Sequence, residues 1–425
     1  MACLCLSGGL IYLLPFLREV YYIPLQEALE LSNTELGVLM STFGAVAMIC
    51  YFPGGWLADR VSSRKLITFS MVGTGLVGLY FATFPPYILS VAVHALWGIT
   101  CTLTFWAAMI KATRNWAPCD QQGRAFGILE GGRGIAEIAS STAFLAIFAR
   151  LGSGNLGLSW VILLFSISNI LIGVMAWFTL EDEKEEGGRL KIGLSEIRNV
   201  LKTPVVWWIS LVILSAYSAY WGSFYFTPYA TEVFLMSVVF GGAIGVGKMW
   251  VKPVAALGAG FLADRIGASK TVSGSFIILI FSFAVFIFTP GNPTLVMILV
   301  ANTAVASFAI FALRGVYFAL LEEGGLPFAL TGTVTGVVSV IGFTPDVFMP
   351  LAGGLILDSL PDDLRYRCLF AFIALLCFIG FLASLMVKRT ALAPGQPCYE
   401  RLVLFSRPMQ KSSAQEVEKN RKEER

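Results

Sequence analysis

Four basic side chains lie inside otherwise apolar stretches: Arg18, Arg133, Lys248 and Lys252. A charge buried in an apolar helix is costly, and such residues usually serve a function. At about 1.5 Å per helical residue, Arg133 lies about 14 Å along a helix from Arg124. On the same scale Lys252 lies about 18 Å from Asp264, with Lys248 one turn further along the same face. We therefore expect the four cations to line one cavity and to bind an anion.

Acidic residues accompany these cations. Glu130, Arg133 and Glu137 follow one another at i, i+3 and i+7, which places them on one helix face. Glu19 adjoins Arg18, and Asp346 could pair with Arg314 on a neighbouring segment. Two roles are open for the acids: ion pairs that hold helices together, or carriers of a coupled proton, since burial favours a neutral carboxyl. Glu130, Glu137 and Asp346 are the proton-coupling candidates.

Aromatic residues cluster in the first and seventh apolar segments. We take Tyr22, Tyr217 and Trp221 as candidates to line the cavity and hydrogen-bond a substrate. The alternative is an aromatic belt at the membrane surface, where tyrosine and tryptophan are enriched.

The elements that hold these residues are predicted from composition. Of the 425 residues, 56% are hydrophobic and only 13% are charged, whereas a soluble domain has about 25% charged residues. A membrane-spanning helix needs about 20 mainly apolar residues. Twelve segments qualify, at 3–24, 34–58, 66–84, 86–110, 125–149, 158–180, 204–228, 235–262, 271–289, 293–320, 328–357 and 366–387. The sequence therefore predicts an all-α membrane protein with twelve transmembrane helices in two pseudo-symmetric bundles of six.

The loops predict domain boundaries and orientation. A polar linker at 181–203 separates a bundle at 1–180 from a bundle at 204–387, and a charged tail at 388–425 is expected to be disordered. Lys and Arg are concentrated in alternate loops, the linker and the tail, which places both termini in the cytoplasm. The scattered cysteines and the lone histidine match no metal site, and no cofactor or enzymatic motif is expected.

A hexapeptide is repeated in the two halves. The run from Gly55 to Arg60 reads G-W-L-A-D-R, and the run from Gly260 to Arg265 reads G-F-L-A-D-R. Each copy ends the second segment of its half, and a basic residue follows at Lys65 or Lys270. Duplicated halves with matching loops are typical of secondary transporters.

This repeated loop resembles the signature of the major facilitator superfamily, and the resemblance covers nearly the whole chain. It implies two bundles that alternate access to a site near the membrane midplane. In the family, the aspartate and basic residues of this motif hold the halves together on the cytoplasmic side, so Asp59, Arg60 and Arg64 would form a charge latch. The gating residues implied are Gly55, Asp59, Arg60, Arg64, Gly260, Asp264 and Arg265.

Within the superfamily, 14–37 and 122–128 resemble the sugar-phosphate and organophosphate permeases. That group clamps phosphate between arginines of the first and seventh spans. Arg18 fits the first position, whereas the seventh span, 215–222, has no arginine.

These observations predict a secondary transporter of a small organic anion, such as a sugar acid or phosphorylated metabolite, working by exchange or proton symport. An efflux transporter of drug-like compounds and a transporter-like receptor are the alternatives. We expect a monomer in a bacterial inner membrane whose partners are its substrate and the lipid bilayer, and no nucleic acid, because no basic stripe is present.

Overall fold

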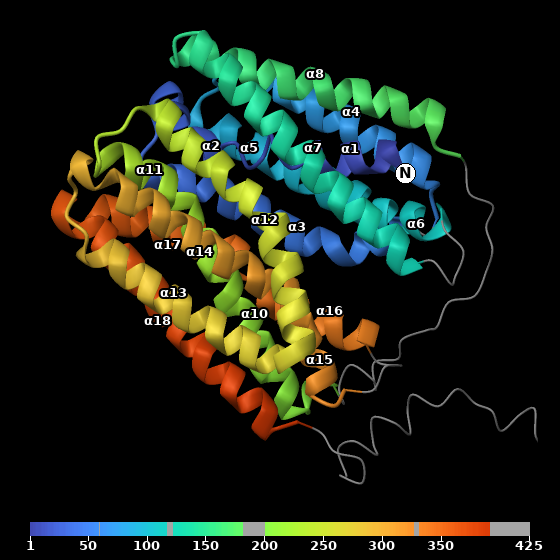
Figure 1. Ribbon diagram of the computed structural model, residues 1–425. Coiled ribbons are helices and arrows are strands. Elements are labelled where there is room, and N and C mark those ends of the chain that lie inside the picture. The colour runs from blue at the N-terminus through green and yellow to red at the C-terminus, as the bar shows by residue number, and fades with distance from the viewer. Residues whose placement is uncertain (59, 117–121, 182–199, 327–330, 392–425) are drawn as a thin grey trace, which may run out of the picture.

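The computed structural model describes residues 1–58, 60–116, 122–181, 200–326 and 331–391, and every regular element in them is a helix (Figure 1). The elements of the first half are α1 (Ala2–Leu10), α2 (Arg18–Leu29), α3 (Asn33–Ala58), α4 (Ser63–Phe81), α5 (Tyr87–Gly98), the π-helix η1 (Ile99–Trp106), α6 (Ala107–Trp116), α7 (Gln122–Arg150) and α8 (Asn155–Thr179).

The second half follows the residues around the predicted linker, of which 182–199 lie outside the described residues. Its elements are α10 (Pro204–Gly222), the short 3₁₀ helix η3 (Ser223–Tyr225), α11 (Phe226–Glu232), α12 (Val238–Ile266), α13 (Ala268–Phe288), η4 (Pro293–Leu295), α14 (Val296–Val316), η5 (Tyr317–Ala319), α15 (Leu320–Glu323), α16 (Thr331–Gly342), α17 (Pro345–Ser359) and α18 (Asp362–Arg389).

A helix, or consecutive helices, occupies each of the twelve predicted segments, which confirms the all-α membrane fold. Nine helical stretches in the described residues are long and apolar enough to cross a membrane. The other three segments are less regular or more polar. The first is broken between α1 and α2, α4 has Arg64 and Lys65 in its first turn, and α7 carries Glu130, Arg133 and Glu137. These charges lower the mean hydropathy of a segment that is nonetheless helical.

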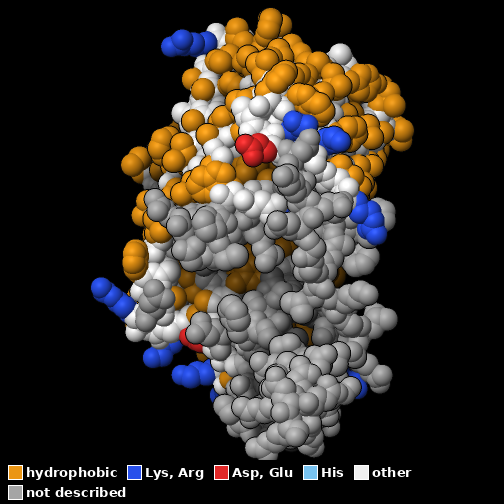
Figure 2. Space-filling model, turned by 90° about the vertical axis from the view of Figure 1, so that its right-hand side faces the viewer, with side chains coloured by type: hydrophobic (Ala, Val, Ile, Leu, Met, Phe, Trp, Pro, Cys, Tyr) orange, Lys and Arg blue, Asp and Glu red, His pale blue; other side chains and the backbone are white. Residues whose placement is uncertain are grey.

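The helices form two halves that lie against each other (Figure 1). In the first half α4 packs on α8 and α1 on α7, and in the second half α18 packs on α10 and α13 while α12 packs on α14. The largest contact between the halves joins α3 to α17, and α12 also packs on α2 and α7. Figure 2, turned by 90° from the view of Figure 1, shows hydrophobic side chains over much of the upper part of this face.

The break in the first segment places charged residues between the halves. Helix α1 ends at Leu10, and α2 begins at Arg18 after a run of turns. Within α2, Tyr21 leaves the helical region (φ −114°, ψ 42°) and Pro24 cannot donate a backbone hydrogen bond. The predicted continuous span at 3–24 is therefore two short helices, and Glu19, just after the break, contacts Lys248 of α12.

Glycines allow α3 and α17 to approach closely. A Cβ added to Gly44 would lie 2.4 Å from the carbonyl oxygen of Asp346, and one added to Gly37 would lie 2.3 Å from that of Pro350. Small residues permit such contacts between membrane helices. The two halves consequently meet backbone to backbone along this pair.

The two ends of the molecule differ in charge. We call the end where α3 leads into α4 and α12 leads into α13 the basic end, because Arg60, Lys65, Arg265 and Lys270 are exposed there. The opposite end holds the start of α3 and the end of α17. There the Asp358 carboxylate accepts hydrogen bonds from the backbone N–H of Asn33 (3.1 Å) and Thr34 (2.6 Å) and from the Asn33 amide (2.8 Å). We call this contact between the halves the Asp358 latch.

Candidate functional site

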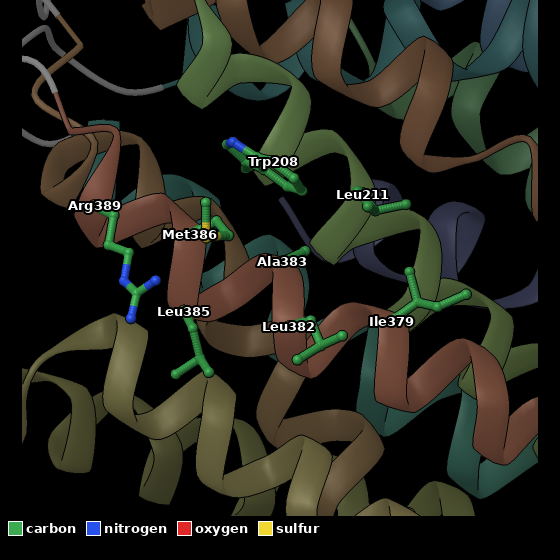
Figure 3. A pocket seen from close by; sticks show the side chains of 8 residues that line it. All are labelled: Trp208, Leu211, Ile379, Leu382, Ala383, Leu385, Met386 and Arg389. Carbon is green, nitrogen blue, oxygen red and sulfur yellow. The ribbon is translucent and has the colours of Figure 1, made fainter.

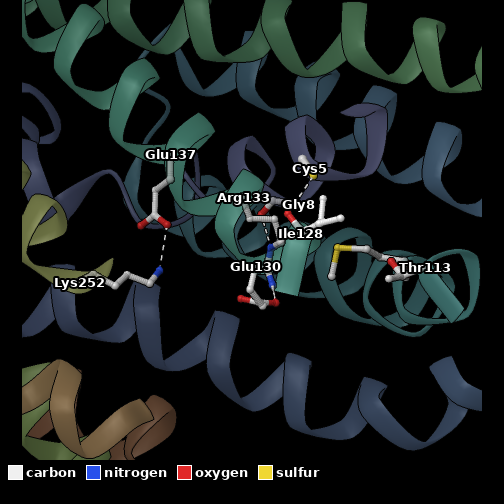
Figure 4. Close-up of polar contacts among 9 residues, drawn as sticks. Cys5, Gly8, Thr113, Ile128, Glu130, Arg133, Glu137 and Lys252 are labelled. Carbon is white, nitrogen blue, oxygen red and sulfur yellow. Dashed lines mark hydrogen bonds and ion pairs between the residues drawn. The ribbon is translucent and has the colours of Figure 1, made fainter. Parts of the chain in front are cut away.

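Two lysines of α12 form ion pairs with glutamates of the first half. Lys248 Nζ lies 2.7 Å from Glu19 Oε1, and Lys252 Nζ lies 3.1 Å from Glu137 Oε2. The lysines are four residues apart and therefore share one face of α12. Figure 4 shows the second pair reaching across from α12 to α7. Both pairs connect the halves, so breaking them is part of any separation of the halves at this level.

The two pairs differ in their exposure to solvent. The Lys248 side chain is fully buried and Glu19 is 8% exposed, whereas Lys252 is 36% exposed and Glu137 24%. Lys248 also donates a hydrogen bond to Ser223 Oγ (2.9 Å) and lies 4.4 Å from the centre of the Phe224 ring. A diffusing anion can therefore reach Lys252 more readily than Lys248 in this conformation.

Arg133 is held within the first half. Its Nε donates to the carbonyl oxygen of Gly8 (3.1 Å), and its Nη1 lies 2.5 Å from Glu130 Oε1 (Figure 4). The guanidinium also lies 5.6 Å from the centre of the Trp106 ring. Gly8 makes room for this side chain, since a Cβ there would lie 2.7 Å from Arg133 Cδ. The Glu130 side chain is 60% exposed, so this pair borders solvent.

Arg18 is buried in an aromatic setting at the junction of the halves. It is 1% exposed, and its guanidinium lies 4.9 Å from the ring of Tyr22 and 5.3 Å from that of Tyr225. Its Nη1 donates a long hydrogen bond to the carbonyl oxygen of Leu36 (3.5 Å), while Nε and Nη2 have no hydrogen-bond partner. Tyr22 itself donates to Asn33 Oδ1 (2.9 Å), beside the Asp358 latch.

Asp346 and Arg314 lie near the aromatic residues of α10 but form no ion pair with each other within the described residues. Trp221 Nε1 donates to Asp346 Oδ1 at 2.8 Å. The Arg314 guanidinium instead lies over the ring of Tyr220, at 4.0 Å, and 5.6 Å from that of Tyr217. The pairing of Arg314 with Asp346 considered from sequence is therefore not formed. Trp221 contacts the aspartate, whereas Tyr217 lies near the arginine.

The repeated motif lies at the basic end, away from these charges. Asp59 lies outside the described residues, as does the side chain of Asp264. Arg60 and Arg265 are exposed, and Arg64 lies 4.9 Å from the Trp177 ring. Among the described residues, no atom outside the glycine's own helix backbone lies within 4 Å of a Cβ added at Gly55 or Gly260. The gating role of the motif stays a prediction.

A residue that the sequence reasoning missed fixes the loop after the second motif. Glu323 accepts hydrogen bonds from the backbone N–H (2.9 Å) and the hydroxyl of Ser269, at the start of α13. Gly267, two residues before Ser269, has a φ of +98°, and a Cβ added there would lie 2.9 Å from Glu323 Oε1. Ser223, which accepts a hydrogen bond from Lys248, was also missed, because a serine in an apolar run carries no distinctive signal.

Comparisons with known proteins agree with this arrangement. The family model described as the Major Facilitator Superfamily matches residues 2–345. The chain is 33% identical over 397 residues to the inner membrane protein YihN of Escherichia coli K12, covering 91% of this chain and 94% of that protein. It is 25% identical over 349 residues to the probable nitrate/nitrite transporter NarK2 of Mycobacterium tuberculosis, covering 79% and 83% of the two chains.

Among solved structures, a bacterial homologue of the human lysosomal transporter Spinster, in an inward-facing and occupied conformation, superposes with a TM-score of 0.72 at 15% identity. The match covers 92% of this chain and 98% of the other and shows a shared fold. The chain is thus an integral, multi-pass membrane protein and a transporter rather than an enzyme, and it belongs to the Major Facilitator Superfamily.

Proposed function

We propose that this transporter moves a small organic anion, such as a sugar acid or phosphorylated metabolite, by alternating access between the halves. The observation that carries the proposal is the set of cations where the halves meet. Arg18 and Arg314 have aromatic neighbours and no carboxylate partner among the described residues, and Lys248 and Lys252 are held only by single glutamates. The relative named as a nitrate/nitrite transporter supports an anion as cargo.

The partly exposed Lys252–Glu137 pair suggests how an anion would act. A substrate carboxylate or phosphate that binds Lys252 competes with Glu137 for the ammonium group and is repelled by the negative charge of Glu137, which favours displacement of that glutamate. The displaced Glu137 then either takes up a proton or stays charged beside Arg133. The first course gives proton–anion symport, and the second favours exchange, in which a leaving anion is replaced by another.

The conformational cycle in this proposal uses the two halves as units. Residues 1–180 and 204–387 would move about the substrate, joined by the linker 181–203, in a monomer in a bacterial inner membrane with both termini cytoplasmic. The extensive α3–α17 contact and the Asp358 latch close the opposite end in this conformation. Entry from the basic end, near the motif residues, is consistent with that closure.

A ligand screen on purified protein tests the anion assignment. A ligand present at about 100 times its Kd stabilises the native state by about 2.7 kcal/mol and so raises the unfolding midpoint. We expect an organic anion to raise the unfolding midpoint of the wild type, and to raise that of Arg133→Gln and Lys252→Gln by less. Lys65→Gln, which removes an exposed cation at the basic end, is the control and should respond as the wild type does. Uptake of that anion into proteoliposomes would follow. Stabilisation by neutral or cationic compounds only would contradict the proposal and favour drug efflux instead.

A further inference from the structure

Two apolar grooves lie side by side on the outside of the second half, remote from the charges described above. The larger, of about 420 Å³, lies between Trp208 and Leu211 of α10 and Leu382 and Met386 of α18 (Figure 3). The smaller, of about 230 Å³, is lined by the same two α10 residues together with Trp207, and it reaches Ile341 of α16. Trp208 and Leu211 are three residues apart on one helix face, so they form a wall common to both grooves.

Basic residues mark one end of these grooves. Figure 3 shows the apolar side chains of α18 in a row that ends at Arg389. Helices α10 and α18 run antiparallel, so Lys202, just before α10, lies at the same end as Lys388 and Arg389. All three are exposed, and none forms an ion pair within the described part of the chain. Such a group of cations attracts anionic headgroups.

The adjacent Trp207 places this end at the membrane surface. Its side chain is 50% exposed, and its indole donates to the carbonyl oxygen of Leu201 at 2.8 Å. Tryptophan is enriched where the hydrocarbon core meets the headgroups, because its ring is apolar and its N–H is polar. The grooves therefore run from the headgroup level into the hydrocarbon region.

We propose that these grooves bind one anionic two-chain phospholipid. One acyl chain lies in each groove, on either side of Trp208, and the headgroup phosphate lies against Arg389 with Lys388 and Lys202 nearby. Two neighbouring grooves with a common wall match two chains joined at one headgroup, and the charge of Lys202, Lys388 and Arg389 is complementary to that of the headgroup. This site is independent of the proposed substrate and would exist whatever the transporter carries.

Native mass spectrometry of the full-length protein with phosphatidylglycerol or phosphatidylcholine of equal chain length tests the headgroup contact. We expect one phosphatidylglycerol to be retained in preference to phosphatidylcholine. Arg389→Gln should retain it about fivefold less well, as expected for the loss of one basic residue near an anionic headgroup. Lys270→Gln removes an exposed cation at the same end but away from the grooves, and should behave as wild type. Equal retention of the two lipids, or an equal loss in both variants, would overturn the proposal.

Fluorescence quenching by phosphatidylglycerol with brominated chains tests the grooves themselves. The contribution of Trp208 is obtained by comparing wild type with Trp208→Phe, and that of Trp250, which is 58% exposed on α12, from Trp250→Phe. We expect about one lipid per protein to quench Trp208, whereas Trp250 should need bulk lipid. Melting temperatures establish that both variants are folded. Quenching of both tryptophans over the same range of lipid would show only general contact with the bilayer.

Discussion

Removing the Asp358 latch should open the end of the molecule that is closed in this structure. The carboxylate accepts three hydrogen bonds, at 2.6, 2.8 and 3.1 Å, from the first residues of α3. Two of the donors are backbone N–H groups at a helix N-terminus, which have no partner within their own helix. Asp358→Ala deletes all three bonds without changing either helix.

The size of the effect follows from the role of Asp358 as a helix cap supplied by the other half. Loss of a capping side chain costs about 0.5–2 kcal/mol. Asp358 is exposed, so solvent screens its charge and water can replace part of the bonding. We therefore expect Asp358→Ala to destabilise the closed conformation by about 1 kcal/mol. Since 1.4 kcal/mol corresponds to a factor of ten, this is about a fivefold shift toward conformations in which the halves separate at this end.

Distance measurements between spin labels can detect this shift. Labels at Thr83, after α4, and Thr294, before α14, report the separation of the halves at the closed end, and the exposed Cys368 is first replaced by serine. Asp358→Ala should enlarge the population of long distances about fivefold. Asp363→Ala is the control. It removes a nearby exposed carboxylate that forms no ion pair with the described residues, and it should leave the distribution of label distances unchanged. An unaltered distribution in Asp358→Ala, with normal melting, would refute the reasoning.

Three further perturbations act on contacts between the halves. Gly44→Val should abolish the closed conformation in the same spin-label assay, because its Cβ would lie 2.4 Å from the Asp346 carbonyl oxygen. Gly274→Val in α13 is the control, because no described atom outside its own helix backbone lies within 4 Å of an added Cβ there. Lys248→Met should lower the melting temperature by leaving the buried Glu19 unpaired, at a cost of about 3–5 kcal/mol, and adding Glu19→Gln should recover much of the loss. Glu137→Gln frees its lysine partner, so it should tighten anion binding in titration calorimetry and make that affinity less dependent on pH; weaker binding would show that Glu137 contacts the substrate directly.

Most of the fold was predictable from the sequence because runs of about 20 mainly apolar residues mark most of the membrane helices. The break between α1 and α2 was not predictable, although Pro24 and the adjacent Arg18 and Glu19 were visible. An apolar run of about 20 residues favours one helix, and the contact of Glu19 with Lys248 beyond the break cannot be deduced from that run. The hydropathy of a segment therefore predicts how many helical segments there are, whereas breaks within a segment become visible only with the contacts between distant residues.

The candidate site was predictable in its residue types and only partly in its geometry. The i, i+4 spacing of Lys248 and Lys252 correctly placed them on one helix face, but spacing within α12 contains no information about the acids on α2 and α7 that meet them. The same limit applies to Asp358, which is unremarkable in sequence. Its role arises from α17 lying beside α3, a contact that depends on glycines of both helices: a Cβ added to Gly354 would lie 2.4 Å from the carbonyl oxygen of Asn33, and one added to Gly37 would lie 2.3 Å from that of Pro350.

The contacts between the halves form two levels with different chemistry, and this difference bears on how an anion could drive the cycle. At the closed end, the Asp358 latch joins a carboxylate to backbone donors, which an anionic substrate inside the protein cannot reach. Deeper in the interface, the Lys252–Glu137 pair is partly exposed and an anion can compete for the lysine directly. Binding would therefore loosen the inner level first and leave the latch as the remaining barrier. Consequently Asp358→Ala should accelerate opening at the closed end even without substrate. Glu137→Gln, in contrast, should change only the contact at Lys252, which the substrate can reach.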